Sequence, residues 1–253
     1  VELLIALQKN YNDWLHDFCG ASNGRLYGLA ALPVQDPGAA LEELERVIAM
    51  GYKGVIVPSN APKGTRYCDD EYEPLWARAE EAGVPVSFHV GCSSHSPNWL
   101  KEYATIDSIA MYGNTASLIQ GTLVEFICRG ICERHPNLKL VVAEFNAGWI
   151  AYWLDRIDQA WKRDYGKDPS MPKPRNVHEI WRRQFHATIE DDQAALRTRD
   201  MIGEDTLMWG SDYPHTDSTW PCSAAVLDEM FEHFPSEAKK KITYDNVKAL
   251  YSL

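Results

Sequence analysis

The sequence predicts an α/β protein of the (β/α)8 barrel class whose amino-terminal strands are missing from this chain. Short apolar runs alternate regularly with stretches of helical apolar spacing, which is the pattern of parallel strands connected by helices. Six such units are too many for a small doubly wound domain and too few for a closed barrel, and the chain opens on a helical pattern. An open Rossmann-like sheet is the alternative, but no strand leads into a Gly-x-Gly-x-x-Gly turn.

Local signals place the helices of the first half. Asp36 followed by Pro37 is a typical helix start. Asp70 and Glu73 resemble a capping box for the next helix. A long segment with helical apolar spacing follows, from about residue 107 to 134. The opening segment also has the spacing of an amphipathic helix, and its apolar face carries Val1, Leu4, Ile5, Tyr11, Trp14, Leu15 and Phe18.

The second half continues the alternation. A strand ending at Glu144 leads through an Asn-Ala-Gly turn into an aromatic helix. Three prolines between Lys167 and Arg175 predict a surface loop. Helices are expected near residues 192–202, 221–234 and 236–250. The strands themselves are expected near 26–32, 54–58, 86–90, 139–144, 185–189 and 207–211.

Composition excludes several classes of protein. The 253 residues are 45% hydrophobic and show neither a repeat nor a domain boundary, so residues 1–253 are expected to form one barrel domain. A net charge of −11 argues against nucleic acid or an anionic membrane as the main partner. The longest uncharged stretch, 108–124, is too short and polar to span a bilayer. No leader pattern opens the chain, and six cysteines without framework spacing are typical of reduced thiols, so we expect a cytoplasmic protein.

Three of the expected strands end in a side chain that can bind a metal. His89, Glu144 and Asp212 each close a short apolar run that Gly, Pro or Asn soon follows. In a parallel sheet wound with helices, functional side chains gather at the carboxyl ends of the strands, because the loops there open onto one face. A single such residue is more often a hydrogen-bonded core histidine or a helix cap. The coincidence of all three favours a metal-centred active site.

Six segments, in order along the chain, match the sequence pattern of a known family: 28–33, 51–55, 88–90, 135–139, 210–214 and 245–251. On these segments the sequence resembles the amidohydrolase-related metal-dependent enzymes, in the branch that contains aminocarboxymuconate-semialdehyde decarboxylase. The resemblance implies a (β/α)8 barrel holding a divalent metal, often zinc. It implies that His89 is the metal-binding histidine of the fifth strand and Asp212 the carboxylate of the eighth strand, which binds the metal and moves a proton. Two further ligands would come from a first strand that is absent here, and Glu144 stands where relatives have a histidine.

Imidazole and carboxylate ligands suit zinc, manganese or iron, and zinc is the first choice from the resemblance. His215, three residues after Asp212, is a candidate proton shuttle or substrate contact, with loop packing as the alternative. Further candidates for substrate binding are Trp149, Arg156 and His95, although a core aromatic, a surface ion pair and a loop residue are the ordinary readings of such positions.

Three functions remain open from the sequence. The first choice is a hydrolase in which metal-activated water attacks a small organic substrate, because the negative charge of Glu144 suits water activation. A close alternative is a non-oxidative decarboxylase, or carboxy-lyase, of a small carboxylic acid. The least favoured is a non-catalytic barrel used as a binding module. A small-molecule substrate is the expected partner, and a homo-oligomer is an open option.

Overall fold

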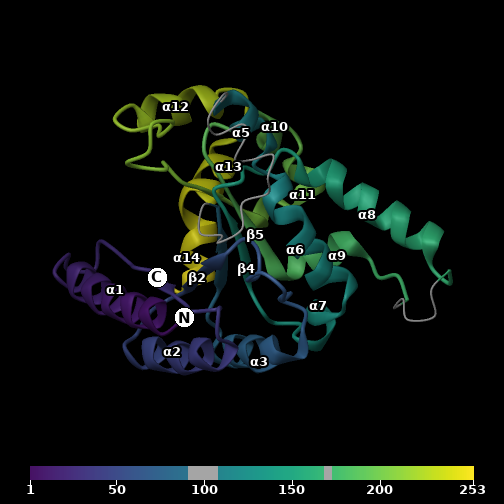
Figure 1. The fold of residues 1–253 in the computed structure, drawn as a ribbon. Helices are drawn as coiled ribbons and strands as arrows, with labels where there is room; N and C mark the ends of the chain where they lie inside the picture. Colours follow the sequence, from purple (N-terminus) through teal and green to yellow (C-terminus); the bar gives the residue numbers. More distant parts are fainter. Residues whose placement is uncertain (91–107, 168–172) are drawn as a thin grey trace. The chain divides into compact units, whose positions relative to one another are not determined.

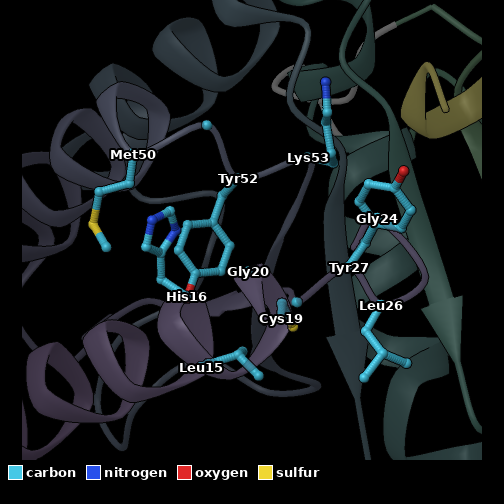
Figure 2. A pocket seen from close by; sticks show the side chains of 12 residues that line it. Leu15, His16, Cys19, Gly20, Gly24, Leu26, Tyr27, Met50, Tyr52 and Lys53 are labelled. Carbon is cyan, nitrogen blue, oxygen red and sulfur yellow. The ribbon is translucent and has the colours of Figure 1, made fainter. Parts of the chain in front are cut away.

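The computed structural model of the protein describes residues 1–90, 108–167 and 173–253 (Figure 1). The chain divides into two compact units, Val1–Leu140 and Val141–Leu253. In each unit the strands follow one another in sequence order and helices connect them, as expected from the alternating pattern of the sequence.

The first unit contains three parallel strands in the order β1, β2, β3. Ala30 of β1 pairs with Val55 of β2, and Val55 pairs with Val86 of β3. Helices α2 and α3 lie side by side in Figure 1. The elements of this unit are α1 (Glu2–Gly20), β1 (Ala30–Ala31), α2 (Pro37–Ala49), β2 (Val55–Pro58), η1 (Asp70–Tyr72), α3 (Glu73–Ala82), β3 (Val86–His89), α5 (Ser108–Asn114), α6 (Ser117–Cys128) and α7 (Ile131–Arg134).

The second unit carries the strands β4, β5 and β6, again in sequence order. Strands β5 and β6 are parallel, with Ala187 opposite Leu207 and Ile189 opposite Trp209. The elements are β4 (Leu140–Ala143), α8 (Ile150–Asp164), α9 (Val177–Gln184), β5 (Phe185–Ile189), α10 (Gln193–Arg197), α11 (Arg199–Ile202), η2 (Glu204–Thr206), β6 (Leu207–Trp209), α12 (Ser223–Met230), α13 (Ser236–Lys240), the π-helical turn η3 (Lys241–Asp245) and α14 (Asn246–Tyr251).

Each unit has its own aromatic core. In the first unit, Tyr67 contacts the rings of Tyr72, Trp76 and Phe88, and all four side chains are fully buried. In the second unit, Trp181 stacks on Phe185 with ring centroids 4.9 Å apart. Aromatic pairs in these arrangements add to the free energy gained by burying apolar area. In each unit, the core holds the helices against the strands of that unit.

The opening helix is confirmed, but its packing differs from the expectation. Tyr11, Trp14 and Phe18 are 47%, 55% and 53% exposed, and the ring of Trp14 contacts those of Tyr11 and Phe18 on the same helix. The fully buried residue of α1 is Asn12, whose side chain bonds both the N–H and the carbonyl of Ala31 in β1. A polar side chain therefore holds this helix on the sheet, because the unpaired backbone groups of β1 need a partner.

Other local expectations also need correction. The expected strand at 26–32 is limited to β1, and Leu26 is exposed. The proposed capping box at Asp70 and Glu73 is wrong, because Glu73 instead accepts hydrogen bonds from Arg134. The segment 107–134 is broken into three helices. The second break, between α6 and α7, lies at Gly130, whose φ of 82° does not allow a right-handed helix to continue. Helix α9 was not anticipated.

In the described parts of the chain, we find no helix that is both long enough and apolar enough to cross a membrane.

Candidate functional site

Two of the three expected strand-end residues have an unusual backbone conformation. Glu144 follows β4 with a φ of 68°, and Asp212 lies after β6 with a φ of 55°. Residues other than glycine rarely adopt this left-handed region, which costs on the order of 1–3 kcal/mol for a side chain held there. Such strain gathers at functional sites, where the surrounding structure over-determines the position of a side chain.

Hydrogen bonds to β5 and to the loop that follows it fix the turn that carries Glu144. The Glu144 N–H donates to Thr188 Oγ1 at 2.9 Å. Asp192 Oδ2 accepts the N–H groups of Ala147 and Gly148, both at 2.7 Å. A Cβ at Gly148 would lie 2.5 Å from the Cβ of Ala194, so this close approach requires glycine. The carboxylate of Glu144 is thus presented by a backbone with little freedom to move.

Asp212, His215 and Glu144 meet at one place. His215 Nδ1 lies 2.9 Å from both carboxylate oxygens of Asp212 and 3.4 Å from Glu144 Oε1. The side chain of His215 is 56% exposed, whereas those of Glu144 and Asp212 are 26% and 15% exposed. The hydrogen bond to Asp212 raises the pKa of His215 above its ordinary value. The two predicted catalytic carboxylates and the predicted proton shuttle therefore form one cluster, in which His215 is hydrogen-bonded to Asp212 and close enough to Glu144 for an ion pair.

A second acidic group shares Asp212. Glu190, which directly follows β5, and Asp217 each place an oxygen within 4.8 Å of an Asp212 oxygen and of each other. Burial, followed by the negative charges of Asp217 and Asp212, raises the pKa of Glu190 to about 8. The pKa of Asp212 is also raised, chiefly by burial, although the hydrogen bond from His215 opposes this. Glu190 and Asp212 therefore keep their protons to a higher pH than isolated carboxylates would.

The donor set of this cluster fits a divalent cation. Carboxylate oxygens with imidazole nitrogen are ligands that manganese, zinc and iron accept. Glu190 Oε1 is buried without a hydrogen-bond partner among the residues that the structure describes. A buried oxygen without a partner is costly, and a nearby cation or its ligands would compensate that cost. The residues placed to contribute oxygens are Glu144, Asp212, Glu190 and Asp217.

His89 ends β3 in the first unit. Its Nδ1 lies 2.5 Å from the carbonyl oxygen of Val90. Donation from Nδ1–H to a backbone carbonyl fixes the tautomer in which Nε2 carries the lone pair, as is usual for metal-binding histidines. Its convergence with Glu144 and Asp212 stays a prediction.

The other predicted site residues have different surroundings. The indole N–H of Trp149 donates to the carbonyls of Phe145 and Asn146, which fixes it in the turn after β4. Arg156 is exposed on α8 and donates to Gln159 three residues away. His95 lies outside the described residues. The structure thus brings Glu144, Asp212 and His215 together, and the roles of Trp149, Arg156 and His95 in substrate binding stay predictions.

Sequence reasoning missed Glu190 and Asp217. Glu190 could have been found, because it directly follows the apolar strand Phe185–Ile189 just as Glu144 follows β4. No local pattern marks Asp217, since its place beside Asp212 depends on the path of the loop after β6.

The chain is similar to known decarboxylases. Gamma-resorcylate decarboxylase from Rhizobium sp. (strain MTP-10005) is 28% identical over 229 residues, which are 83% of this chain and 66% of that protein. The 2-amino-3-carboxymuconate-6-semialdehyde decarboxylase of Dictyostelium discoideum is 24% identical and is covered to 60%. The chain therefore spans about two thirds of the length of these relatives.

Solved structures show the same fold. An amidohydrolase from Mycobacterium avium subsp. paratuberculosis matches all of this chain and 65% of its own, with a TM-score of 0.83 and 26% identity. A dihydroxybenzoic acid decarboxylase from Polaromonas sp. JS666, with bound manganese and the inhibitor 2-nitroresorcinol, matches 98% of this chain and 76% of its own, with a TM-score of 0.79 and 23% identity. The expected barrel class is confirmed. Because the amidohydrolase family model matches residues 1–253 throughout, the chain belongs to the amidohydrolase family.

Proposed function

We propose that the protein is a metal-dependent decarboxylase of a small carboxylic acid, with hydroxybenzoates as the first candidates. The observation that carries the proposal is the strained carboxylate cluster around Asp212, in a chain whose curated relatives are decarboxylases. This replaces hydrolysis, the first choice from the sequence, with the alternative that the sequence kept close behind.

Manganese is the preferred metal in this proposal, instead of zinc. An oxygen-rich donor set suits manganese, and the dihydroxybenzoic acid decarboxylase structure contains it. Asp212 and Glu144 would hold the cation, with His89 as the expected nitrogen ligand. When bound, a divalent cation supplies positive charge that attracts and orients the oxygens of an acidic substrate.

Decarboxylation needs a proton for the carbon that loses carbon dioxide. Asp212 and His215 share a short hydrogen bond, and both have raised pKa values. A proton can therefore reside on this pair near neutral pH and pass to the ring carbon of a hydroxybenzoate. The carbon–carbon bond to the carboxylate then breaks, and its electron pair restores the aromatic ring as carbon dioxide leaves.

The negative charge of Glu144 opposes the binding of an acidic substrate, and the groups around Glu144 reduce this repulsion. Glu190, with a pKa of about 8, is mostly uncharged at neutral pH. His215 is more readily protonated than an isolated histidine, because the Asp212 carboxylate accepts a hydrogen bond from its Nδ1. Two of the groups around Glu144 are thus neutral or positive when an anionic substrate would approach.

The test is decarboxylation in heavy water. We expect the manganese-loaded protein to convert gamma-resorcylate or another hydroxybenzoate to carbon dioxide and a phenol that carries one deuterium at the vacated ring carbon. Headspace analysis measures the gas, and mass spectrometry measures the deuterium. An Asp212→Asn variant is the matched control and should release neither product above background.

Hydrolysis is the second candidate, because a carboxylate such as Glu144 can take a proton from water. Simple esters and amides of the same aromatic acids, assayed with the same manganese-loaded protein, distinguish the two functions. Hydrolysis of these compounds without release of carbon dioxide from any acid would overturn the decarboxylase proposal.

A further inference from the structure

Two large aromatic side chains are exposed on the loop after β6, the loop that carries Asp212 and His215. Tyr213 and Trp220 are 62% and 61% exposed, and their ring centroids lie 5.1 Å apart at an angle of 63°. Other tryptophans of the second unit, such as Trp153 and Trp181, are almost fully buried. Exposing a paired Tyr and Trp to water forgoes the free energy of burying apolar surface, so the pair needs an explanation other than stability.

Hydrogen bonds within the loop after β6 hold the two rings together. The Ser211 carbonyl accepts hydrogen bonds from the N–H of Thr219 at 3.1 Å and from the hydroxyl of Ser218 at 2.7 Å. The Ser218 hydroxyl oxygen in turn accepts the N–H of Trp220 at 3.2 Å. These bonds close the loop after β6 on itself, which returns Trp220 to the side of Tyr213.

The same loop carries the reactive group. Tyr213 directly follows Asp212, and adjacent Cα atoms are only about 3.8 Å apart. The His215 N–H also donates to the Asp212 carbonyl at 2.9 Å, so the histidine is part of the same closed loop. Tyr213 is thus joined directly to Asp212, which belongs to both acidic groups of the candidate site, and Trp220 packs against it.

We propose that Tyr213 and Trp220 form an aromatic wall that receives the planar ring of the substrate. This inference rests on the proposed decarboxylase function and deepens it, because it assigns two residues that would select an aromatic acid over an aliphatic one. Aromatic rings prefer offset-stacked or edge-to-face partners, and the tilted pair offers such an arrangement to a third ring. Tyr and Trp are also the side chains most often found where binding energy concentrates.

Equilibrium binding tests the wall without requiring turnover. The probes are gamma-resorcylate, the saturated acid cyclohexanecarboxylate and the cation benzylamine, each titrated calorimetrically into the protein with and without Mn²⁺. We expect gamma-resorcylate to bind more tightly than cyclohexanecarboxylate. In Trp220→Leu the ratio of the two affinities should fall by about three- to tenfold, which corresponds to the interaction energy of one aromatic pair. Trp220→Phe keeps a ring and should restore most of it.

Tyr152→Leu is the matched control. Tyr152 is 71% exposed on α8 in the same unit, so the change removes an exposed ring far along the sequence from the loop after β6. Its preference for gamma-resorcylate should equal that of the unchanged protein. Circular dichroism and manganese content of every variant verify folding, and a Tyr213→Leu variant repeats the test should Trp220→Leu not fold.

Three results would overturn the wall: no preference for the aromatic acid, equal preference in Trp220→Leu and the unchanged protein, or tighter binding of benzylamine than of either acid. The last would assign the pair to an organic cation. If the aromatic preference depends on Trp220 but no carbon dioxide is released, the wall stands and only the decarboxylase proposal fails.

Discussion

Glu43 and Glu190 are both shielded carboxylates, but their surroundings are opposite. Glu43, in the first unit, is fully buried, and its Oε1 accepts from Asn12 and from Arg46, each at 2.7 Å, while Oε2 accepts from Arg46 at 2.9 Å. Glu190, in the second unit, has a buried oxygen without a hydrogen-bond partner among the described residues, and carboxylates surround it.

The difference separates a structural network from a functional one. Around Glu43, every acceptor has a donor, so the buried charge is compensated by the protein itself. Around Glu190, carboxylates lie close together, and their mutual repulsion is relieved only when one of them is protonated or a cation binds. We therefore expect changes in the first network to lower stability and changes in the second to affect metal binding and turnover.

The largest effect is expected for Asp212→Asn. Loss of a residue that moves a proton typically lowers the rate by about a hundred- to ten-thousandfold. Manganese content should fall as well, since the oxygen shared by both acidic groups loses its charge. Turnover of gamma-resorcylate and metal analysis are the measurements. Full activity in a variant of normal metal content would show that the cluster is not functional.

Glu43→Gln is the counterpart in the first unit. Removing one partner of a buried ion pair costs about 3 kcal/mol at the lower end of the usual range, and Asp13 still holds Arg46 here. Urea denaturation should show the loss as a lower midpoint with an unchanged slope. The turnover rate of the folded variant should stay normal, and a lowered rate without lost stability would break the comparison.

Glu144→Gln distinguishes a metal ligand from a group that acts on water or substrate. If Glu144 is a ligand, manganese affinity should fall by at least the about 10- to 100-fold that loss of a residue supporting a ligand costs, and activity should fall with it. If it acts on water, turnover should fall strongly while metal content stays near normal. Unchanged activity in the metal-loaded variant would mean that a glutamate at this position is incidental.

Glu190→Gln should have the smallest effect, and it depends on pH. In the folded protein Glu190 has a pKa of about 8, above the ordinary 4.5, so the folded state retains a proton that the unfolded state has lost between these values. The stability of the metal-free protein therefore falls as the pH rises through this window.

Glutamine removes this penalty. Metal-free Glu190→Gln should melt about 2–4 °C higher than the unchanged protein above pH 8, the shift that about 1 kcal/mol produces in a chain of this size. At pH 4.5 the two melting temperatures should be nearly equal. A gain that is equally large at both pH values would show that the charge of Glu190 is not the cause.

Much of the fold could be predicted from the sequence because its signals are local. The strand β5 has the predicted bounds, and the start of α2 at Asp36 and Pro37 has the expected cap. Runs of apolar residues and capping side chains act within a few positions, so their pattern is visible without the fold. The family resemblance, and Glu144 and Asp212 as strand-end carboxylates, follow from the same kind of signal.

The tertiary structure decided what depends on residues far apart in the chain. Periodicity alone placed Tyr11 and Trp14 on a packing face, whereas Asn12 is the buried residue of α1, because its amide completes the backbone hydrogen bonds of β1. The sequence pattern predicted that Glu73 takes part in a helix cap, but in the structure its carboxylate accepts a hydrogen bond from Arg134, 61 residues later. The sequence by itself determined which side chains end the strands. Only the folded loops decided that Glu190 and Asp217 join Asp212, because like charges are brought together by the path of the backbone and not by any attraction between them.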